Sequence, residues 1–448
     1  MEAEHKRLNY SYEIVIVKND KIYGCYHSAD GRNTLVVEDI EEDKILREVE
    51  TDCNGSILCI SVDKIGNIYL IESKNDINNA WKIALDDKVT LLENFVLEDQ
   101  DPIHNTILKG IYIDKEDRFY LWTKVSIPYS EVNPDAPEDV WARTDRIYIK
   151  DSNMNTITYV QIPDCDGMQL LGIVEGETGN ISLLAKNAEG YYVQNIDEKG
   201  EGEPEFISEL SLQTNCDYIA KDGEDIILIQ GNSVYKYTKK QKGLQRIMNL
   251  SSYGIDATKI IYFGKNSEGI EIVDYYGQNK DTEYTILKEG EDNKKEITLA
   301  TIQMQGTLED IVTSYNRYNS QYRVKVIDYY DPLRTDMTID ECIDNLYLSI
   351  IQGNAADILD VSLVDYDMLG QKGGLTDLYQ MIQRDPEIST DMLEDNIIKQ
   401  FQTGNRLYAM APAFQIYSMW GKETLIQGRD SVSVHELSEM LKQRNKSI

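Results

Sequence analysis

The sequence predicts a multidomain chain in which an all-β propeller of six or seven blades is followed by an α/β region. Two observations predict this order. Hairpin-forming segments recur along residues 12–288 without a helical period, and after residue 290 strand periods alternate with helical ones. Hydrophobic residues make up 41% of the 448 residues, which is enough to build cores and excludes global disorder. We therefore expect domains at 1–290 and 291–448.

The first domain is built from a repeating unit. Each unit has an apolar strand, a turn rich in Asp, Gly or Asn, and a second apolar strand, followed by room for two more strands. Six units start about 45 to 60 residues apart, at 12–26, 57–72, 107–122, 170–185, 216–230 and 260–274. Four antiparallel strands at such a period are typical of a propeller blade. The ring closes either through a seventh blade upstream or through the N-terminal strand; a pair of β-sandwiches is the alternative fold.

Two features of the units bear on packing and contacts. The inner strands should be the most apolar, as Ile68, Leu70, Ile111 and Ile113 are. The third unit carries an insertion at 126–141 that is too polar and too rich in proline for a strand, so we expect a surface loop there. Aromatic residues of this unit that a ligand might meet are Trp122, Tyr129 and Trp141, for which a structural role is the alternative.

The second domain alternates strands and helices, which predicts a parallel sheet. Strands are expected at 297–304, 322–329 and 356–362. A helix opens at Thr307, with Asp310 completing a capping box, and its expected inward face is Leu308, Ile311, Val312, Tyr315 and Tyr318. A second helix carries Ile343, Leu346, Tyr347, Ile350 and Ile351 on one stripe and stops at Gly353. Shorter helices at 375–383, 391–402 and 433–443 and buried strands at 406–412 and 415–420 follow.

Charge and cysteine usage exclude several classes of function. Lys and Arg number 45 against 78 Asp and Glu, a formal charge of −33 that would repel nucleic acid and anionic membranes. No apolar stretch is long enough for a membrane helix, and the first residues lack the apolar core of a signal peptide. The six cysteines form no Cys-x-x-Cys pair, which argues against structural zinc and a thioredoxin-type site and leaves disulfides open.

The sequence carries no recognisable enzyme signature. It lacks the nucleophile-elbow, zinc-protease, phosphate-loop and dinucleotide-binding motifs, and its four histidines share no metal-ligand spacing. We therefore predict no catalytic residue, no metal site and no cofactor. Pairs of carboxylates are abundant among 78 acids, so glycosidase chemistry stays an alternative that chance pairing explains as well.

A series of short motifs runs through residues 296–443. Residues 351–362 (IQGNAADILDVS) carry a Gly-x-x-Ala-Asp-hydrophobic step, and GLTDLYQ and GNRLYAMAP follow at 374–380 and 404–412. Two more motifs follow, at 419–425 and 433–441. In this order the series resembles the opening of an extracellular solute-binding protein, the carbohydrate-type receptor of ABC importers. Ala356 stands where that family usually has proline, and Trp420-Gly421 where it usually has Tyr-Asn.

The resemblance implies a function and a location. It implies a periplasmic-binding-protein-like α/β domain whose second lobe lies beyond Ile448, and an extracellular lipoprotein whose signal and lipid anchor lie outside this chain. Such a protein is no enzyme: it captures a sugar or oligosaccharide for the membrane subunits of an ABC importer, while the propeller contacts glycans or a protein. The alternatives are a propeller glycosidase or lyase and a non-catalytic surface scaffold.

Candidate ligand contacts follow from where such sheets bind. Sugar sites pair aromatic faces with amide or carboxylate groups, and ligands gather at the carboxyl ends of parallel strands. The expected contacts in the loops after the first and third strands are Gln305, Ser362, Asp365 and Tyr366. Phe414 and Trp420, near the crossing to the second lobe, are further candidates, with core packing as the alternative.

Overall fold

The structure is a computed structural model of the whole chain. It describes residues 2–411 and Glu436, apart from 30, 76, 93–106, 129–140, 163–167, 176–180, 188, 198, 203, 210–215, 224, 239, 241–242, 278–279, 291–292, 305 and 333–336. The chain forms two compact units, Met1–Val364 and Asp365–Ile448, which are described in turn. Among the described residues, no helix is long and apolar enough to cross a membrane.

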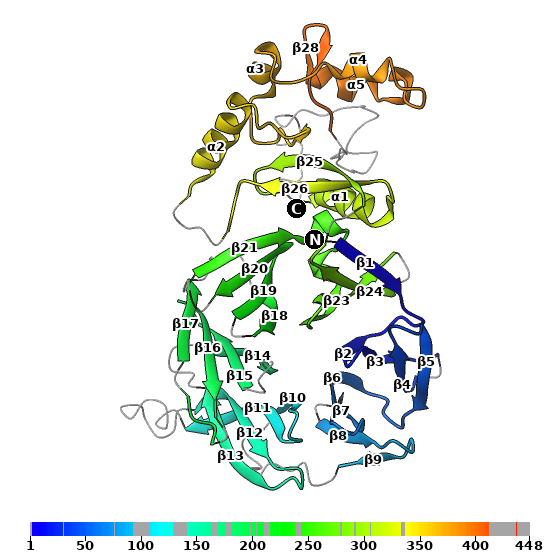
Figure 1. Cartoon of the computed structure of the whole chain (residues 1–448), viewed down its shortest axis with the longest axis vertical. Helices are drawn as coiled ribbons and strands as arrows, with labels where there is room; N and C mark the ends of the chain where they lie inside the picture. Colours follow the sequence, from blue (N-terminus) through cyan, green and yellow to red (C-terminus); the bar gives the residue numbers. More distant parts are fainter. Residues whose placement is uncertain are drawn as a thin grey trace, which may run out of the picture. The chain divides into compact units, whose positions relative to one another are not determined.

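Six four-stranded antiparallel sheets form the ring of a six-bladed β-propeller (Figure 1). Blade one contains β2 (Ile14–Lys18), β3 (Lys21–His27), β4 (Asn33–Asp39) and β5 (Lys44–Glu50). Blade two contains β6 (Ser56–Val62), β7 (Ile68–Lys74), β8 (Ile77–Ile83) and β9 (Val89–Leu91). Blade three contains β10 (Ile107–Ile113), β11 (Phe119–Pro128), β12 (Trp141–Lys150) and β13 (Thr156–Ile162). Blade four contains β14 (Gln169–Glu175), β15 (Ile181–Lys186), β16 (Gly190–Ile196) and β17 (Pro204–Glu209). Blade five contains β18 (Cys216–Asp222), β19 (Asp225–Gln230), β20 (Ser233–Thr238) and β21 (Gly243–Asn249). Blade six contains β22 (Ile260–Lys265), β23 (Gly269–Tyr276), β24 (Asp281–Lys288) and β1 (Glu2–Arg7).

The N-terminal strand closes the ring. β1 pairs antiparallel with β24, from Glu2 opposite Lys288 to Arg7 opposite Glu283, and so becomes the outer strand of blade six. Of the two closures that the sequence left open, the structure has this one, and the ring is six-bladed.

The first strand of each blade is the innermost, because first strands of neighbouring blades contact one another. In five blades the first strand shifts register against the second near its start, opposite Glu72, Thr123, Ala185, Gln230 and Asp274. These five residues therefore occupy one equivalent position of the repeat. Blades two and six have a carboxylate at this position, Glu72 and Asp274.

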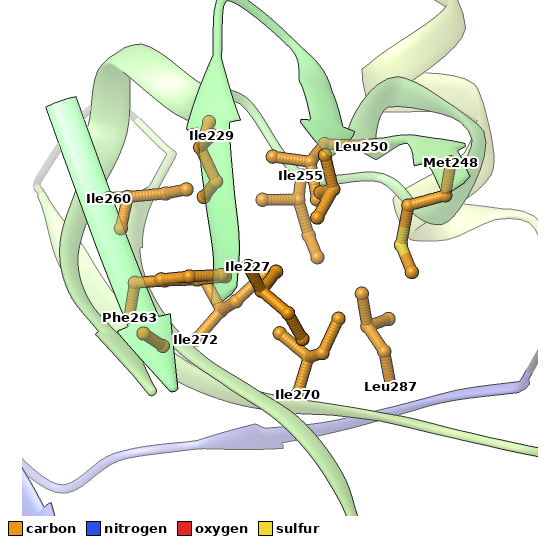
Figure 2. Close-up of a cluster of buried hydrophobic side chains, with 12 residues drawn as sticks. Ile227, Ile229, Met248, Leu250, Ile255, Ile260, Phe263, Ile270, Ile272 and Leu287 are labelled. Atoms are coloured by element: carbon orange, nitrogen blue, oxygen red, sulfur yellow. The ribbon is translucent and has the colours of Figure 1, made fainter. Parts of the chain in front are cut away.

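Apolar side chains are buried between blades, as a ring of sheets requires. Figure 2 shows the cluster in which Ile227 and Ile229 of blade five meet Ile270 and Ile272 of blade six. Burying a side chain of this size stabilises the fold by about 1.5–3 kcal/mol. The inner residues expected to be apolar, Ile68, Leu70, Ile111 and Ile113, are all buried.

The expected surface loop of blade three is shorter than predicted. β11 continues through Pro128 and β12 begins at Trp141, so that Pro128 lies opposite Trp141 at the end of a long hairpin. The polar stretch therefore tolerates strand pairing at both ends, which the proline content had argued against. Tyr129 and the rest of the insertion lie outside the described residues.

After the last blade the chain forms a three-stranded parallel sheet, as the sequence predicted. Its order is β26 (Tyr322–Asp328), β25 (Lys295–Thr301), β27 (Ile358–Leu359), with α1 (Gly306–Tyr318) and α2 (Ile339–Ile351) as crossovers. α1 begins at Gly306, one residue before the expected start at Thr307, and a capping box is present on α2, at Thr338 and Glu341. β27 has only two residues, and Asp357 fixes it by accepting hydrogen bonds from the Thr298 N–H and hydroxyl, both at 2.8 Å.

The inward face predicted for α1 is correct for Val312 and for the half-buried Leu308, and wrong for the other three residues. Val312, Thr313 and Asn316 are buried, whereas Ile311, Tyr315 and Tyr318 are 44%, 37% and 67% exposed. One side of α1 packs on the sheet through Val312, and another packs on the propeller through polar residues. Hydrophobic periodicity cannot report a buried polar face. On α2, Ile351 is likewise exposed, although Leu346 is buried as expected.

The propeller seals the edge strand of the parallel sheet. Val326 of β26 donates its N–H to Ser252 Oγ (2.9 Å) in the short helix η2 (Leu250–Tyr253) of the propeller, and Val324 donates its N–H to Asn316 Oδ1 (2.6 Å). Asn316 in turn donates to the Ser251 carbonyl at 2.8 Å. These contacts place the parallel sheet in the same compact unit as the ring. The division at residue 290 stays a prediction.

The second unit contains short helices and a hairpin. They are α3 (Tyr366–Gln371), α4 (Leu378–Ile382), η4 (Thr390–Met392), α5 (Asp395–Ile398), η5 (Lys399–Phe401), β28 (Gln402–Thr403) and β29 (Arg406–Leu407). Ile382, Ile398 and Leu407 form its buried cluster. The strand expected at 406–412 is reduced to two residues, and α3 was not predicted. The expected elements at 415–420 and 433–443 lie outside the described residues, apart from Glu436.

Candidate functional site

The structure describes three of the six predicted contacts, Ser362, Asp365 and Tyr366. Ser362 is exposed after β27 and donates its N–H to Asp360 Oδ1 at 3.0 Å. Asp365, the N-cap residue of α3, ends the loop after β27, and Tyr366 is the first residue of the helix. That they contact a ligand stays a prediction. Gln305, Phe414 and Trp420 lie outside the described residues.

Asp365 and Tyr366 both make local structural contacts. Asp365 Oδ1 accepts the Met368 N–H at 2.9 Å, so this carboxylate caps a helix. The Tyr366 ring lies 6.1 Å from the Phe401 ring and is half-buried. Among the propeller aromatics, Trp122 donates its indole N–H to Asp145 at 2.9 Å, a structural contact. The Trp141 side chain lies outside the described residues.

Polar side chains do gather at the carboxyl edge of the parallel sheet. Asp328 is the last residue of β26, opposite Thr301 of β25, and Asp360 directly follows β27, so the two flank the end of the central strand β25. Asp360 Oδ2 accepts the Thr301 hydroxyl at 2.8 Å, and Asp328 Oδ1 accepts the Gln303 N–H at 2.9 Å. Burial raises the pKa of Asp328 above its ordinary value, although backbone donors oppose the rise.

Gln303 has an unusual backbone at this edge. Its φ is 59°, in the left-handed region that side-chain-bearing residues rarely adopt. The hydrogen bond to Asp328 holds it there. Strained backbone conformations of this kind are often found at functional sites.

The propeller forms one wall of this edge. Arg246 of β21 donates to the carbonyls of Asp328 and Tyr330, the latter at 2.7 Å, and the Tyr235 hydroxyl donates to Asp331 at 2.9 Å. Burial, followed by the charge of Asp331, raises the pKa of Tyr235. The loop after β26 is thereby fixed to blade five.

A second carboxyl with a raised pKa lies in the first turn of α1. Burial raises the pKa of Glu309; an Asn232 hydrogen bond opposes the rise, and the charges of Asp256, Asp310 and Asp328 add to it. The edge is therefore rich in acceptors, with Arg246 as a nearby cation. Carboxylates, an amide and a guanidinium suit a neutral ligand with many hydroxyl groups. No group of three or more His, Cys, Asp or Glu in the described part of the chain could hold a metal ion.

Sequence reasoning missed these residues for identifiable reasons. Asp328 and Asp360 lie near the carboxyl ends of the strands expected at 322–329 and 356–362 and were assigned to these strands, whereas the structure ends the strands at Asp328 and Leu359. Gln303 was assigned to the strand itself. Arg246 lies in a different domain of the sequence, and no sequence signal connects it to β26.

A second cluster of charges lies where the inner strands of the propeller end. Lys18 ends β2 and donates to the Val62 carbonyl at 2.7 Å. Burial lowers the pKa of Lys18, while Glu175, Asp63, Asp117 and Asp114 oppose this. These acids come from three other blades. Glu175, which ends β14, accepts the Tyr112 hydroxyl of blade three at 2.7 Å.

Comparisons with known proteins bear on the fold alone. No protein-family model matches the chain, and no curated protein sequence matches it. Virginiamycin B lyase from Staphylococcus aureus is 12% identical with a TM-score of 0.40, and the match covers 64% of this chain and 99% of that one. The luciferin-regenerating enzyme is 8% identical (TM-score 0.43; 64% and 96% covered). The β-propeller domain of the Trilobed protease from Pyrococcus furiosus is 12% identical (TM-score 0.36; 59% and 79%). At these values the matches say nothing about activity.

Proposed function

We propose that this chain is a non-catalytic, extracellular receptor that captures a hydroxylated solute, a carbohydrate in the simplest case. The solute binds at the carboxyl edge of the parallel sheet, and the propeller is the rigid platform that holds this sheet. The resemblance of residues 296–443 to solute-binding proteins of ABC importers supports the carbohydrate and the delivery to importer subunits from a lipid-anchored cell-surface position.

One observation carries the proposal. Asp328 and Asp360 flank the carboxyl end of the central strand, and the left-handed Gln303 lies in the loop that continues this strand. In open α/β sheets this edge is where ligands bind. The groups present are acceptors and an amide, which match the donors of sugar hydroxyls.

The test is a thermal-shift panel of mono- and oligosaccharides. A ligand at one hundred times its Kd stabilises the native state by about 2.7 kcal/mol, so a binder raises the melting midpoint. Gln303→Gly removes the amide without backbone strain, and we expect it to weaken or abolish the shift. Asn19→Gly is the matched control, because Asn19 also has a positive φ (52°) but lies in a turn of blade one. A panel without any shift would overturn the proposal.

A propeller glycosidase or lyase is the second candidate, and the cluster around Lys18 favours it. A buried amine with a lowered pKa among carboxylates is an arrangement that catalytic sites use. Incubating the protein with glycans and measuring new reducing ends or unsaturated products tests this reading. Turnover that disappears in Glu175→Gln and Lys18→Met would establish it and refute the receptor. A protein with neither binding nor turnover is the third candidate, an interaction scaffold.

A further inference from the structure

The closing strand of the ring has little apolar burial of its own. β1 has the sequence EAEHKR, and each of its six residues is exposed or half-buried. The outer strand of blade one, in contrast, buries Val49. Backbone pairing with β24 and the contacts of charged side chains must therefore hold β1 in place.

Those charged side chains form a row across blade six. Arg7 of β1 lies opposite Glu283 of β24, which lies opposite Asp274 of β23. His5 of β1 lies on the same face, with its Nδ1 3.3 Å from Glu283 Oε2 and 2.9 Å from the Thr285 hydroxyl. The closing strand is thus tied to Glu283, which lies beside the buried Asp274 on the next strand.

Helix α1 from the α/β region reaches the same carboxylates. Arg317, whose side chain is 8% exposed, donates to Asp274 and lies 3.7 Å from Glu283 Oε2. Its guanidinium centre is 5.7 Å from the centroid of the Tyr276 ring, and that of Arg7 is 5.1 Å from the same centroid. Arg317 of α1 therefore shares Glu283 with His5 of β1, and it shares the Tyr276 ring with Arg7 of β1.

The repeat shows that blade six is modified for this contact. Glu72, at the equivalent position of blade two, accepts the N–H groups of Asn54 and Gly55 within its own blade, both at 2.7 Å. Asp274 instead turns to a residue of α1. At this position, the carboxylate of blade two binds backbone N–H groups of its own blade, whereas the carboxylate of blade six binds a helix outside the propeller.

The position of α1 leaves no slack. Arg317 Nε donates to the Gly254 carbonyl at 2.7 Å. A Cβ placed on Gly254 would lie 2.7 Å from both the N and the Cα of Arg317, so the two backbones are in direct contact. Asn316 holds the adjacent turn of α1 through Ser251.

We infer that α1 is a clasp on the seam of the propeller: through Arg317 it fixes the carboxylates that anchor the closing strand β1, so that displacement of the α/β region loosens the ring. The inference does not depend on the proposed solute site. A structural change in the α/β region would then affect the propeller by weakening the closure of its ring.

Hydrogen–deuterium exchange of the full chain tests the clasp. Arg317→Met removes the contact and leaves Asp274 and Glu283 without their shared cation. Amide exchange in residues 2–7 should then become at least about tenfold faster. Arg317→Lys keeps the charge but not the geometry of the guanidinium, and should give an intermediate rate. This milder variant keeps the test informative if Arg317→Met does not fold.

The control is a buried pair of the same kind in another blade. Arg118 donates to Asp114 at 2.6 Å within blade three, and Arg118→Met should destabilise the protein without selectively exposing residues 2–7. The clasp is refuted if a folded Arg317 variant exchanges β1 at the wild-type rate, or if Arg118→Met accelerates β1 to the same degree.

Discussion

At the scale of single residues, the propeller depends on aspartates that close its turns. Asp63 and Asp114 follow the first strands of blades two and three, and each accepts hydrogen bonds from two backbone N–H groups and one tyrosine hydroxyl. Asp114 is 0% exposed and also pairs with Arg118. Such a side chain replaces the backbone partners that a tight turn lacks.

We expect Asp114→Ala to lower the free energy of unfolding by about 3–5 kcal/mol, because it leaves buried donors unsatisfied and removes the carboxylate that pairs with Arg118. Urea denaturation measures the loss. The control is Asp151→Ala in the turn between β12 and β13, where Asp151 accepts two N–H groups in the same pattern but is not buried. Equal losses at both sites would contradict the argument that burial sets the cost.

The seam of blade six also predicts a pH dependence. Burial raises the pKa of Asp274 to about 6, although Arg317 opposes the rise. The folded state therefore binds this proton more tightly than the unfolded state, whose carboxyl titrates near about 3.9. The contribution of Asp274 to stability is present in full below about pH 4 and is lost as the pH rises through about 6.

The measurement compares wild type with Asp274→Asn. The difference in unfolding free energy between the two should change by about 2–3 kcal/mol from pH 4 to pH 7, in favour of the variant. Arg317, Glu283 and His5 act on the same carboxyl, and subtracting the variant removes most of their own titration. Parallel pH profiles would show that Asp274 has no such shift.

At the scale of elements, α1 shows how close packing replaces hydrophobic burial. Its propeller-facing side is polar, with Thr313 and Asn316 buried and Arg317 nearly so. Contact is direct because Gly254, the C-cap of η2, has a φ of 74° and no side chain. The helix can therefore approach to backbone distance.

Gly254→Ala should separate α1 from η2. Any Cβ at this φ costs about 1–2 kcal/mol of backbone strain, and here it would also clash with the Arg317 backbone. Gly277→Ala is the control, since Gly277 has a φ of 67° and nothing within 4 Å of the added carbon. We expect the Gly254 variant to lose distinctly more thermal stability than the control. Similar melting midpoints would mean that the contact is not tight.

The sequence predicted the elements that hydrophobic periods specify and missed those that depend on polar contacts. The six blades follow from recurring apolar strands, as Ile68, Leu70, Ile111 and Ile113 illustrate, and the parallel sheet follows from the succession of strands and helices. The face of α1 was misassigned because Asn316 and Arg317 are buried by hydrogen bonds that no period records.

The candidate site was predicted in location more than in residues. The carboxyl edge of the sheet follows from strand order alone, and Asp328 and Asp360 lie there. The cap that Asp365 provides for α3 was not foreseen, because a cap residue and a loop residue look alike in a sequence before the helix is known. Arg246 could not be found, because its contact with the loop after β26 joins residues 82 and 84 positions apart.

At the scale of the whole molecule, the ring and the parallel sheet share one compact unit, and the short helices after Val364 form another. The edge strand β26 completes its hydrogen bonds on Ser252 of the propeller and Asn316 of α1. An edge strand sealed in this way cannot open without breaking contacts to the ring. Cooperativity should therefore follow these contacts and not the change from β to α/β composition.

Denaturant-dependent hydrogen exchange of the full chain should show this cooperativity. We expect β25 and β26 to open with the same free energy as β23 and β24 of blade six, because η2 and Arg317 join the two sheets. The hairpin β28–β29, which belongs to the second unit and has two residues in each strand, should open at lower free energy and provides the internal comparison. If β25 and β26 open together with the hairpin while blade six stays protected, the parallel sheet is an independent module, and neither the sealed edge nor the Arg317 contact couples it to the ring.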